Sequence, residues 1–329
     1  MSAGRLTVSV AMESYDLTRD LVTGQVRPQG IDLVFSELAP EEIFFRFTKY
    51  REWDVSELSL AKYVALVSRG DTEITAIPVF PSRVFRHSSL YVRRDCAATA
   101  LTDLAGTRIG IPEWAQTASV YTRSILADAG VDLTGVQWVQ AGVNQPGREE
   151  KVALDLPEGI RYRSRPDASL NELLLAGEID AVMSARPPDG FGPAPAPIRH
   201  LLADPRAEEL AYFTRTGVFP IMHVTALRRD LLDRHPWLAG NLMTAFDRAR
   251  RNSLRRASDL TVSHYPVPWG ADLARNALPW PGQPWPYGVE ANRTTLEAFL
   301  TAAYQQGVAA RRLAVEELFV ASTLTGYRV

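Results

Sequence analysis

The sequence is poor in cysteine and has no long apolar run. Cys96 is the single cysteine among 329 residues, which excludes an internal disulfide and a site built from several thiolates. No stretch of about 18 apolar residues is present, and residues 1–16 lack the apolar segment of a signal peptide. These features predict neither export nor a membrane span, and they favour the cytoplasm.

Charge imbalance and cofactor motifs are also lacking. The net charge is −2, whereas a nucleic-acid-binding protein would carry a basic face. The arginine-rich stretch at 248–256 has the spacing of a solvated helix surface. The HExxH, GxGxxG, phosphate-loop and GxSxG patterns are absent, so we expect no metal, no organic cofactor and no serine nucleophile.

Apolar strand patterns alternate with amphipathic helix patterns along the chain, which predicts an α/β fold with mostly parallel sheets covered by helices. The length fits two lobes, and we expect lobe 1 at residues 1–90 plus 222–329 and an inserted lobe 2 at 91–221. The chain should cross between the lobes at 77–94 and again at 219–227. Strands are expected at 6–11, 31–35, 54–58, 108–111, 136–140 and 179–183, and helices at 40–53, 60–68, 118–129, 229–258, 294–305 and 314–319.

Small polar groups follow several predicted strands at the point where each strand ends. In open α/β sheets, ligands bind beyond the carboxyl ends of strands and beside helix N-termini. We therefore expect these residues to meet in one cleft. The predicted lining residues are Ser14, Glu57, Glu113, Trp114, Gln116, Thr117, Asn144 and Ser184.

Arginines at strand ends and crossings are candidates for binding a carboxylate, because the planar guanidinium can form two charge-assisted hydrogen bonds. The candidates are Arg83, Arg86, Arg148 and Arg186; the alternative for each is an ordinary surface arginine. In an extended segment, Arg83 would share one side with His87, and Arg86 would share the other with Ser88. We expect the first pair to face the ligand.

Histidines on the two crossings, His87 and His223, are candidate general acids because histidine titrates near working pH. The alternative is a structural role within a strand. Glu113 is a third candidate acid, and it could equally be a capping partner for the helix that follows. Two distant histidines with Glu113 or Glu57 make a weak case for a metal site.

Long segments of this chain resemble the 4,5-dihydroxyphthalate decarboxylases. They include EEIFFRFTKYREWDVSELSLAKYVAL, IPVFPSRVFRHSSLYVRRD, GIPEWAQTASVY, WVQAGVNQPGREEKV and LNELLLAGEIDAVMSARPPD. The resemblance covers nearly the whole chain and departs from the family mainly at 191–197 and after residue 319. It implies a two-lobed fold like that of type II periplasmic binding proteins, and conversion of 4,5-dihydroxyphthalate to protocatechuate and carbon dioxide. It supplies no catalytic residue set.

The implied reaction requires an anchor for the carboxylate that stays, an acid at the ring carbon and an acceptor for a hydroxyl group. We assign Arg83 and Arg148 as anchors, with Arg86 and Arg186 as alternates. His87 is the preferred proton donor, with His223 or Glu113 as second participant and Glu57 as hydroxyl acceptor. The expected partner is a small aromatic dicarboxylate, without nucleic acid or membrane, and a homo-oligomer fits this class. The alternatives are a solute-binding protein for an aromatic carboxylate and a decarboxylase or lyase for a related hydroxylated aromatic acid.

Overall fold

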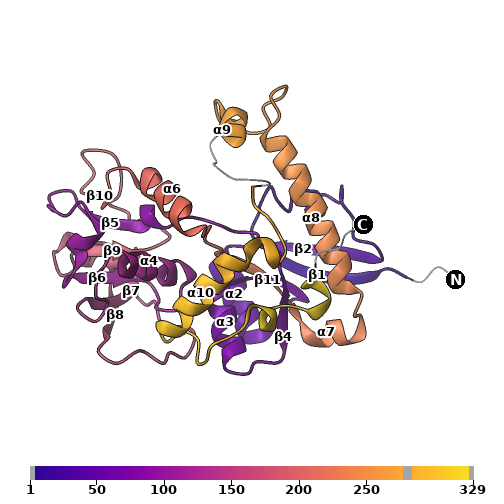
Figure 1. Ribbon diagram of the computed structural model, residues 1–329, viewed down its shortest axis with the longest axis horizontal. Coiled ribbons are helices and arrows are strands. Elements are labelled where there is room, and N and C mark those ends of the chain that lie inside the picture. The colour runs from indigo at the N-terminus through magenta and orange to yellow at the C-terminus, as the bar shows by residue number, and fades with distance from the viewer. Residues whose placement is uncertain (1–3, 277–283, 326–329) are drawn as a thin grey trace.

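Two β-sheets organise the computed structural model, which describes residues 4–276 and 284–325 (Figure 1). The first sheet has the order β2-β1-β3-β11-β4 and the second has the order β10-β5-β9-β6-β7-β8. We keep the names lobe 1 and lobe 2 for the parts around these sheets; the boundaries at residues 90 and 222 stay a prediction. The strands are β1 (Leu6–Met12), β2 (Ile31–Glu37), β3 (Val55–Ser59), β4 (Ile74–Ile77), β5 (Leu90–Arg93), β6 (Arg108–Ile111), β7 (Gln137–Gly142), β8 (Arg161–Ser169), β9 (Ala181–Met183), β10 (Ile198–His200) and β11 (His223–Arg228).

Helices cover the sheets, and their ends follow from local sequence. Helix α2 begins at Pro40, which has no amide hydrogen to leave unpaired, with Glu41 and Glu42 in its first turn. A capping box of Ser169 and Glu172 starts α5. The helices are α1 (Arg19–Val22), α2 (Pro40–Tyr50), α3 (Leu60–Ser68), α4 (Thr117–Asp128), α5 (Leu170–Leu175), α6 (Pro205–Thr216), α7 (Arg229–Arg234), α8 (Leu238–Ala257), α9 (Gly270–Asn276) and α10 (Arg293–Gln305).

Both sheets are mostly parallel, as expected, and each contains a single strand that runs against the others. Strand β1 is parallel to β2 and β3, but β11 returns from the second crossing and runs antiparallel to β3 and β4. In the second sheet, β6, β7, β8 and β9 pair in parallel, while β5 is antiparallel to β9 and β10. The antiparallel strands therefore belong to the crossings between the lobes.

Several elements differ from the sequence-based expectation. Strand β8 was not predicted because its residues are mostly polar and exposed, so they lack the alternation of a half-buried strand. Strand β10 and helix α6 were also not predicted. Residues 314–319, expected to be a helix, contain only a short 3-10 turn at Val315–Leu318.

The first crossing is not an extended strand. Arg83 makes an isolated antiparallel bridge with Ile221 on the second crossing, and His87–Ser89 then forms a 3-10 turn. Side chains alternate between two sides only while the backbone is extended. The predicted grouping of Arg83 with His87 on one side therefore does not apply. The strand expected at 219–227 begins only at His223.

The two lobes share a hydrophobic core and a buried polar contact. Helix α4 of lobe 2 packs against α3 and α10 of lobe 1. Just after α10, the side-chain amide of Gln306 accepts a hydrogen bond from Arg123 and donates to the carbonyl oxygen of Val120, both on α4. This contact fixes the position of α4, whose first residues reach the space between the lobes. None of the described helices is both long and apolar enough to cross a membrane.

Candidate active site

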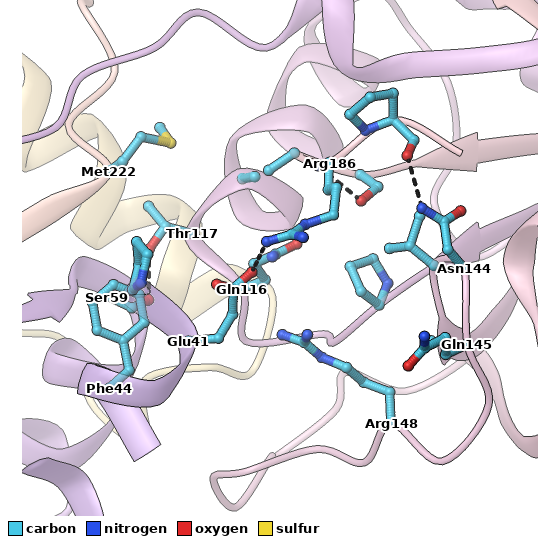
Figure 2. A pocket seen from close by; sticks show the side chains of 18 of the residues that line it. Glu41, Phe44, Ser59, Gln116, Thr117, Asn144, Gln145, Arg148, Arg186 and Met222 are labelled. Atoms are coloured by element: carbon cyan, nitrogen blue, oxygen red, sulfur yellow. Dashed lines mark hydrogen bonds and ion pairs between the residues drawn. The ribbon is translucent and has the colours of Figure 1, made fainter. Parts of the chain in front are cut away.

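A cleft of about 1090 Å³ lies between the two lobes. Lobe 1 contributes the ends of β1 and β3 and the start of β11, and lobe 2 contributes the ends of β6, β7 and β9. Predicted site residues that line it are Arg86, Gln116, Thr117, Asn144, Arg148, Ser184, Arg186 and His223. Figure 2 shows Arg148, Asn144 and Gln145 on the lobe 2 side, facing Glu41, Phe44 and Ser59 of lobe 1.

His223 lines the cleft and is held from behind by Glu57. Its Nδ1 lies 2.5 Å from Oε1 of Glu57, whose side chain is fully buried. The hydroxyl of Tyr15 donates to the same oxygen at 2.6 Å, and the backbone N–H of Glu13 donates to Oε2 at 2.9 Å. With Nδ1 engaged by the carboxylate, Nε2 is the ring nitrogen available to a ligand.

The surroundings of Glu57 keep it ionised. Burial alone would raise its pKa, but the charge of His223 and hydrogen bonds from His223, the Glu13 N–H and Tyr15 outweigh burial and lower the pKa. Burial and the charge of Glu57 together raise the pKa of Tyr15, so its hydroxyl keeps its proton and remains a donor. Glu57 therefore orients His223 rather than facing the ligand itself.

Glu113 is a buried carboxylate surrounded by three cations. Arg148 Nε donates to its Oε1 at 2.8 Å, and Lys151 Nζ lies 3.5 Å from the same oxygen. Lys62 Nζ, from α3 of lobe 1, lies 3.1 Å from Oε2. Because Glu113 belongs to lobe 2, this ion pair connects the lobes and holds two cations, Lys62 and Arg148, at the cleft wall.

Glu113 fits this positioning role better than the role of proton donor. Burial would raise its pKa, but the charges of Lys62, Arg148 and Lys151 lower it overall. An ionised carboxylate has no proton to give. Its side chain has no exposed surface, and it stands behind the cleft wall rather than in it.

Arg86 lines the cleft although it is only 8 % exposed. Its Nε donates to the thioether sulfur of Met222 at 3.1 Å, and a terminal nitrogen lies 3.5 Å from Oγ of Ser89. Burial lowers its pKa to about 10, so it remains a cation near neutral pH. A buried guanidinium with such weak acceptors is well suited to an anionic ligand.

Arg186 reaches across the cleft. Its terminal nitrogen lies 3.2 Å from Oε1 of Glu41, the first acidic residue of α2, and Figure 2 shows this contact between the lobes. Both partners are exposed, so the ion pair by itself contributes little to the stability of the protein. Nearby, Asn144 donates from its side chain to the Pro187 carbonyl oxygen, and Ser184 Oγ accepts from the Arg186 N–H.

Arg83 and His87 lie outside the cleft lining. Arg83 is buried between Phe80 and Phe219 and donates to the side-chain oxygen of Asn292. His87 is buried with its ring centroid 5.2 Å from that of Tyr212, and burial lowers its pKa to about 4. The expectation that this pair lines the cleft is not met. Arg83 lies in the bridge with Ile221, His87 lies in the 3-10 turn, and both side chains are buried away from the cleft lining.

The remaining predicted residues also stand apart from the cleft lining. Trp114 is fully buried, with the guanidinium carbon of Arg123 3.8 Å from its ring centroid. Ser14 is exposed and donates its backbone N–H to Glu13. Ser88 donates its N–H to the carboxylate of Glu209.

Sequence reasoning did not identify Lys62 and Ser59 as site residues, whereas Tyr15 belongs to one of the strand ends expected at the cleft. A signal for Lys62 is present, since it is the single charged residue in the otherwise apolar helix 60–67. Tyr15 stands beside the predicted Ser14 at the end of β1. Ser59 lies at the end of β3, opposite His223 in the strand register, and its hydroxyl is 2.9 Å from that of Thr117.

The described residues contain no group of three or more histidine, cysteine, aspartate or glutamate side chains placed to hold a metal ion. The chemistry that the described side chains offer is acid–base transfer at His223 and binding of anions by Lys62, Arg86, Arg148 and Arg186.

Known proteins resemble this chain in sequence and in structure. It is 38% identical over 328 residues to a 4,5-dihydroxyphthalate decarboxylase from Comamonas testosteroni, covering 99% of both chains. A protein of the same name from Pseudomonas putida is 39% identical over 204 residues, which cover 61% of this chain and 79% of that protein. No family model matches the chain.

Solved structures show the fold. The periplasmic aliphatic sulphonate binding protein SsuA from Escherichia coli matches with a TM-score of 0.54 and 12% identity, over 98% of this chain and 99% of that one. SsuA from Xanthomonas axonopodis pv. citri bound to MOPS matches with a TM-score of 0.51 and 13% identity, over 97% and 99% of the two chains. The expected two-lobed fold of periplasmic binding proteins is confirmed.

Proposed function

This chain belongs to the 4,5-dihydroxyphthalate decarboxylase family, and we propose that it converts 4,5-dihydroxyphthalate to protocatechuate and carbon dioxide. It is a carboxy-lyase, and the proton that replaces the departing carboxylate comes from His223. The observation that supports this assignment is the 2.5 Å contact between Nδ1 of His223 and the buried carboxylate of Glu57 at the cleft wall.

The substrate itself favours protonation of the carboxyl-bearing ring carbon over direct loss of carbon dioxide. Direct loss of carbon dioxide would leave a very basic aryl anion. Each carboxylate of 4,5-dihydroxyphthalate is para to a hydroxyl group, so ionisation of that hydroxyl moves electron density to the carbon that bears the carboxylate. A proton adds to this carbon, the electrons of the breaking carbon–carbon bond return to the ring, and the phenolate takes up a proton again. The net reaction consumes one proton and releases one carbon dioxide.

His223 supplies that proton from Nε2. In its protonated form it donates Nδ1–H to Glu57 and presents Nε2–H to the cleft. The carboxylate of Glu57 fixes the orientation of the ring, and Tyr15 in turn fixes Glu57. A correctly placed general acid contributes roughly 10²–10⁴-fold to the rate.

The charges of the cleft match an aromatic dicarboxylate. Arg86, Arg148 and Lys62 are cations at its wall, and Arg186 adds a fourth that a ligand could draw away from Glu41. Phe44 supplies an apolar surface beside His223, with ring centroids 4.8 Å apart. An aromatic ring stacked near Phe44 would place its carboxylates toward the cations.

The first experiment is to mix the purified protein with 4,5-dihydroxyphthalate and follow protocatechuate by liquid chromatography. In deuterium oxide, the product should carry one deuterium at the carbon that lost its carboxylate, as mass spectrometry and NMR would show. Tight binding without product would instead support a solute-binding protein. A higher kcat/KM for another hydroxylated aromatic acid would assign the chain to a related decarboxylation.

The cytoplasmic location and a homo-oligomeric state stay predictions. Cell fractionation with an antibody against the chain tests the first, and light scattering of the purified protein tests the second.

A further inference from the structure

The product of the proposed reaction retains the chemical feature that makes the substrate reactive. Protocatechuate has one carboxylate, and that carboxylate is also para to a hydroxyl group. The same ipso protonation could therefore remove it and give catechol. If the proposed function holds, an enzyme that stops at protocatechuate must distinguish a ring with two adjacent carboxylates from a ring with one.

Among the cations at the cleft wall, Arg86 differs from the others in its partners. Lys62 and Arg148 are paired with Glu113, and Arg186 is paired with Glu41. Within the described parts of the chain, no carboxylate lies at ion-pair distance from Arg86, whose hydrogen bonds go to Met222 and Ser89.

Among the described residues, Arg86 is therefore a mostly buried cation without a direct ion pair. The charge of Glu209 acts on it from beyond ion-pair distance, and a carboxylate that enters the cleft would supply a direct counter-ion. Met222, whose sulfur accepts the hydrogen bond from Arg86, immediately precedes His223 in the sequence. All three residues line the same cleft. Arg86 and His223 therefore line one cleft, where a single ligand can contact both.

We propose that Arg86 binds the carboxylate that is retained, and thereby limits the enzyme to one decarboxylation per substrate. A dicarboxylate occupies Arg86 with one group and presents the adjacent carboxyl-bearing carbon to His223. When protocatechuate has formed, its only carboxylate is bound to Arg86, and no carboxyl-bearing carbon faces His223. Arg86 is therefore the specificity-determining residue for a vicinal dicarboxylate.

The test uses two unreactive ligands, phthalate and benzoate, which lack hydroxyl groups and differ by one carboxylate. Their dissociation constants are measured by calorimetry for the wild-type protein and for Arg86→Gln. In Arg86→Gln the dissociation constants of both ligands should rise about 10- to 100-fold, as expected for the loss of a charge-assisted interaction, because each ligand holds one carboxylate on Arg86.

Arg83→Gln is the matched control, because Arg83 is a buried arginine of the same segment that does not line the cleft. Its dissociation constants for both ligands should remain those of the wild type. Unchanged dissociation constants in Arg86→Gln would overturn the proposal, as would a wild-type protein that converts protocatechuate to catechol. The second result needs no variant, so the proposal remains testable if Arg86→Gln does not fold.

These binding measurements are independent of turnover. A wild-type protein that forms no protocatechuate but binds phthalate in an Arg86-dependent way would contradict the proposed function and leave the carboxylate site in place. Normal turnover with unchanged dissociation constants in Arg86→Gln would contradict only the role of Arg86.

Discussion

Oε1 of Glu57 lies 2.5 Å from Nδ1 of His223, and the Glu57 side chain has no exposed surface. The two residues come from neighbouring antiparallel strands, β3 and β11, and β11 enters the sheet only after the second crossing. A buried carboxylate held against a histidine at the wall of a cleft is a frequent feature of functional sites.

Replacement of His223 should abolish most turnover. We expect His223→Gln to lower kcat for 4,5-dihydroxyphthalate by about 10²–10⁴-fold, because the proton donor is lost. Glu57→Gln should lower kcat with a smaller change in KM, since it removes the charge that orients the ring. Steady-state kinetics measures both, with His235→Gln at the end of α7 as the control. Unchanged turnover in His223→Gln would remove the assignment.

His87 should make the protein less stable in mild acid. Its pKa is lowered from 6.5 to about 4 in the folded state, so between these values the unfolded chain binds a proton that the folded protein does not. Stability therefore falls as pH decreases through this range, by at most about 3 kcal/mol from this residue. Urea unfolding at pH 7 and pH 4.5 should show a smaller loss in His87→Phe than in the wild type. Equal losses would contradict the buried neutral state.

Removal of Glu113 should destabilise the protein at neutral pH. Glu113→Gln leaves Lys62, Arg148 and Lys151 without their counter-ion, and breaking a buried ion pair typically costs about 3–5 kcal/mol. The folded-state pKa of Glu113 is lowered from 4.5, so its stabilisation is present above 4.5 and disappears as pH falls below that value.

Chemical unfolding at pH 7 and below pH 4 provides the measurement for Glu113→Gln. The difference between this variant and the wild type should be large at pH 7 and should shrink in acid. Glu52→Gln, which removes an exposed pair with Arg46, should remain close to the wild type at both values. A difference that does not change with pH would show that Glu113 is not held as a carboxylate.

Chelation should leave turnover intact. The proposed mechanism uses an acid, its carboxylate partner and cations of the protein, and none of these depends on a divalent ion. After dialysis against a chelator, kcat for 4,5-dihydroxyphthalate should stay within about twofold of the value for the untreated protein, a difference comparable to the error of such measurements. Loss of activity that a divalent ion restores would place a metal in the reaction.

Much of the architecture follows from local sequence patterns. Alternating strands such as β1 and amphipathic helices such as α2 have the periodicity of one buried face, so their positions could be predicted. Strand β8 could not, because a polar, exposed edge strand has no such periodicity. The antiparallel strand in each sheet could not be predicted either, since strand direction depends on where each crossing re-enters a sheet.

The candidate site was predicted only in part. Arg86, Arg148, Arg186 and His223 were identified because they follow strands or lie on crossings, and the structure brings all four to one cleft. His87, the preferred proton donor of the sequence-based assignment, lies outside the cleft lining, in a 3-10 turn whose side chains do not alternate between two sides.

The local sequence thus specifies the α/β alternation, the polar residues at strand ends and the family to which the chain belongs. The tertiary structure specifies which of those residues meet. The Glu57–His223 pair joins residues 166 positions apart, and the Lys62–Glu113 pair joins the two lobes. Such pairs depend on strand register and lobe packing, which bring distant segments together. The local sequence around one residue of a pair does not indicate its partner.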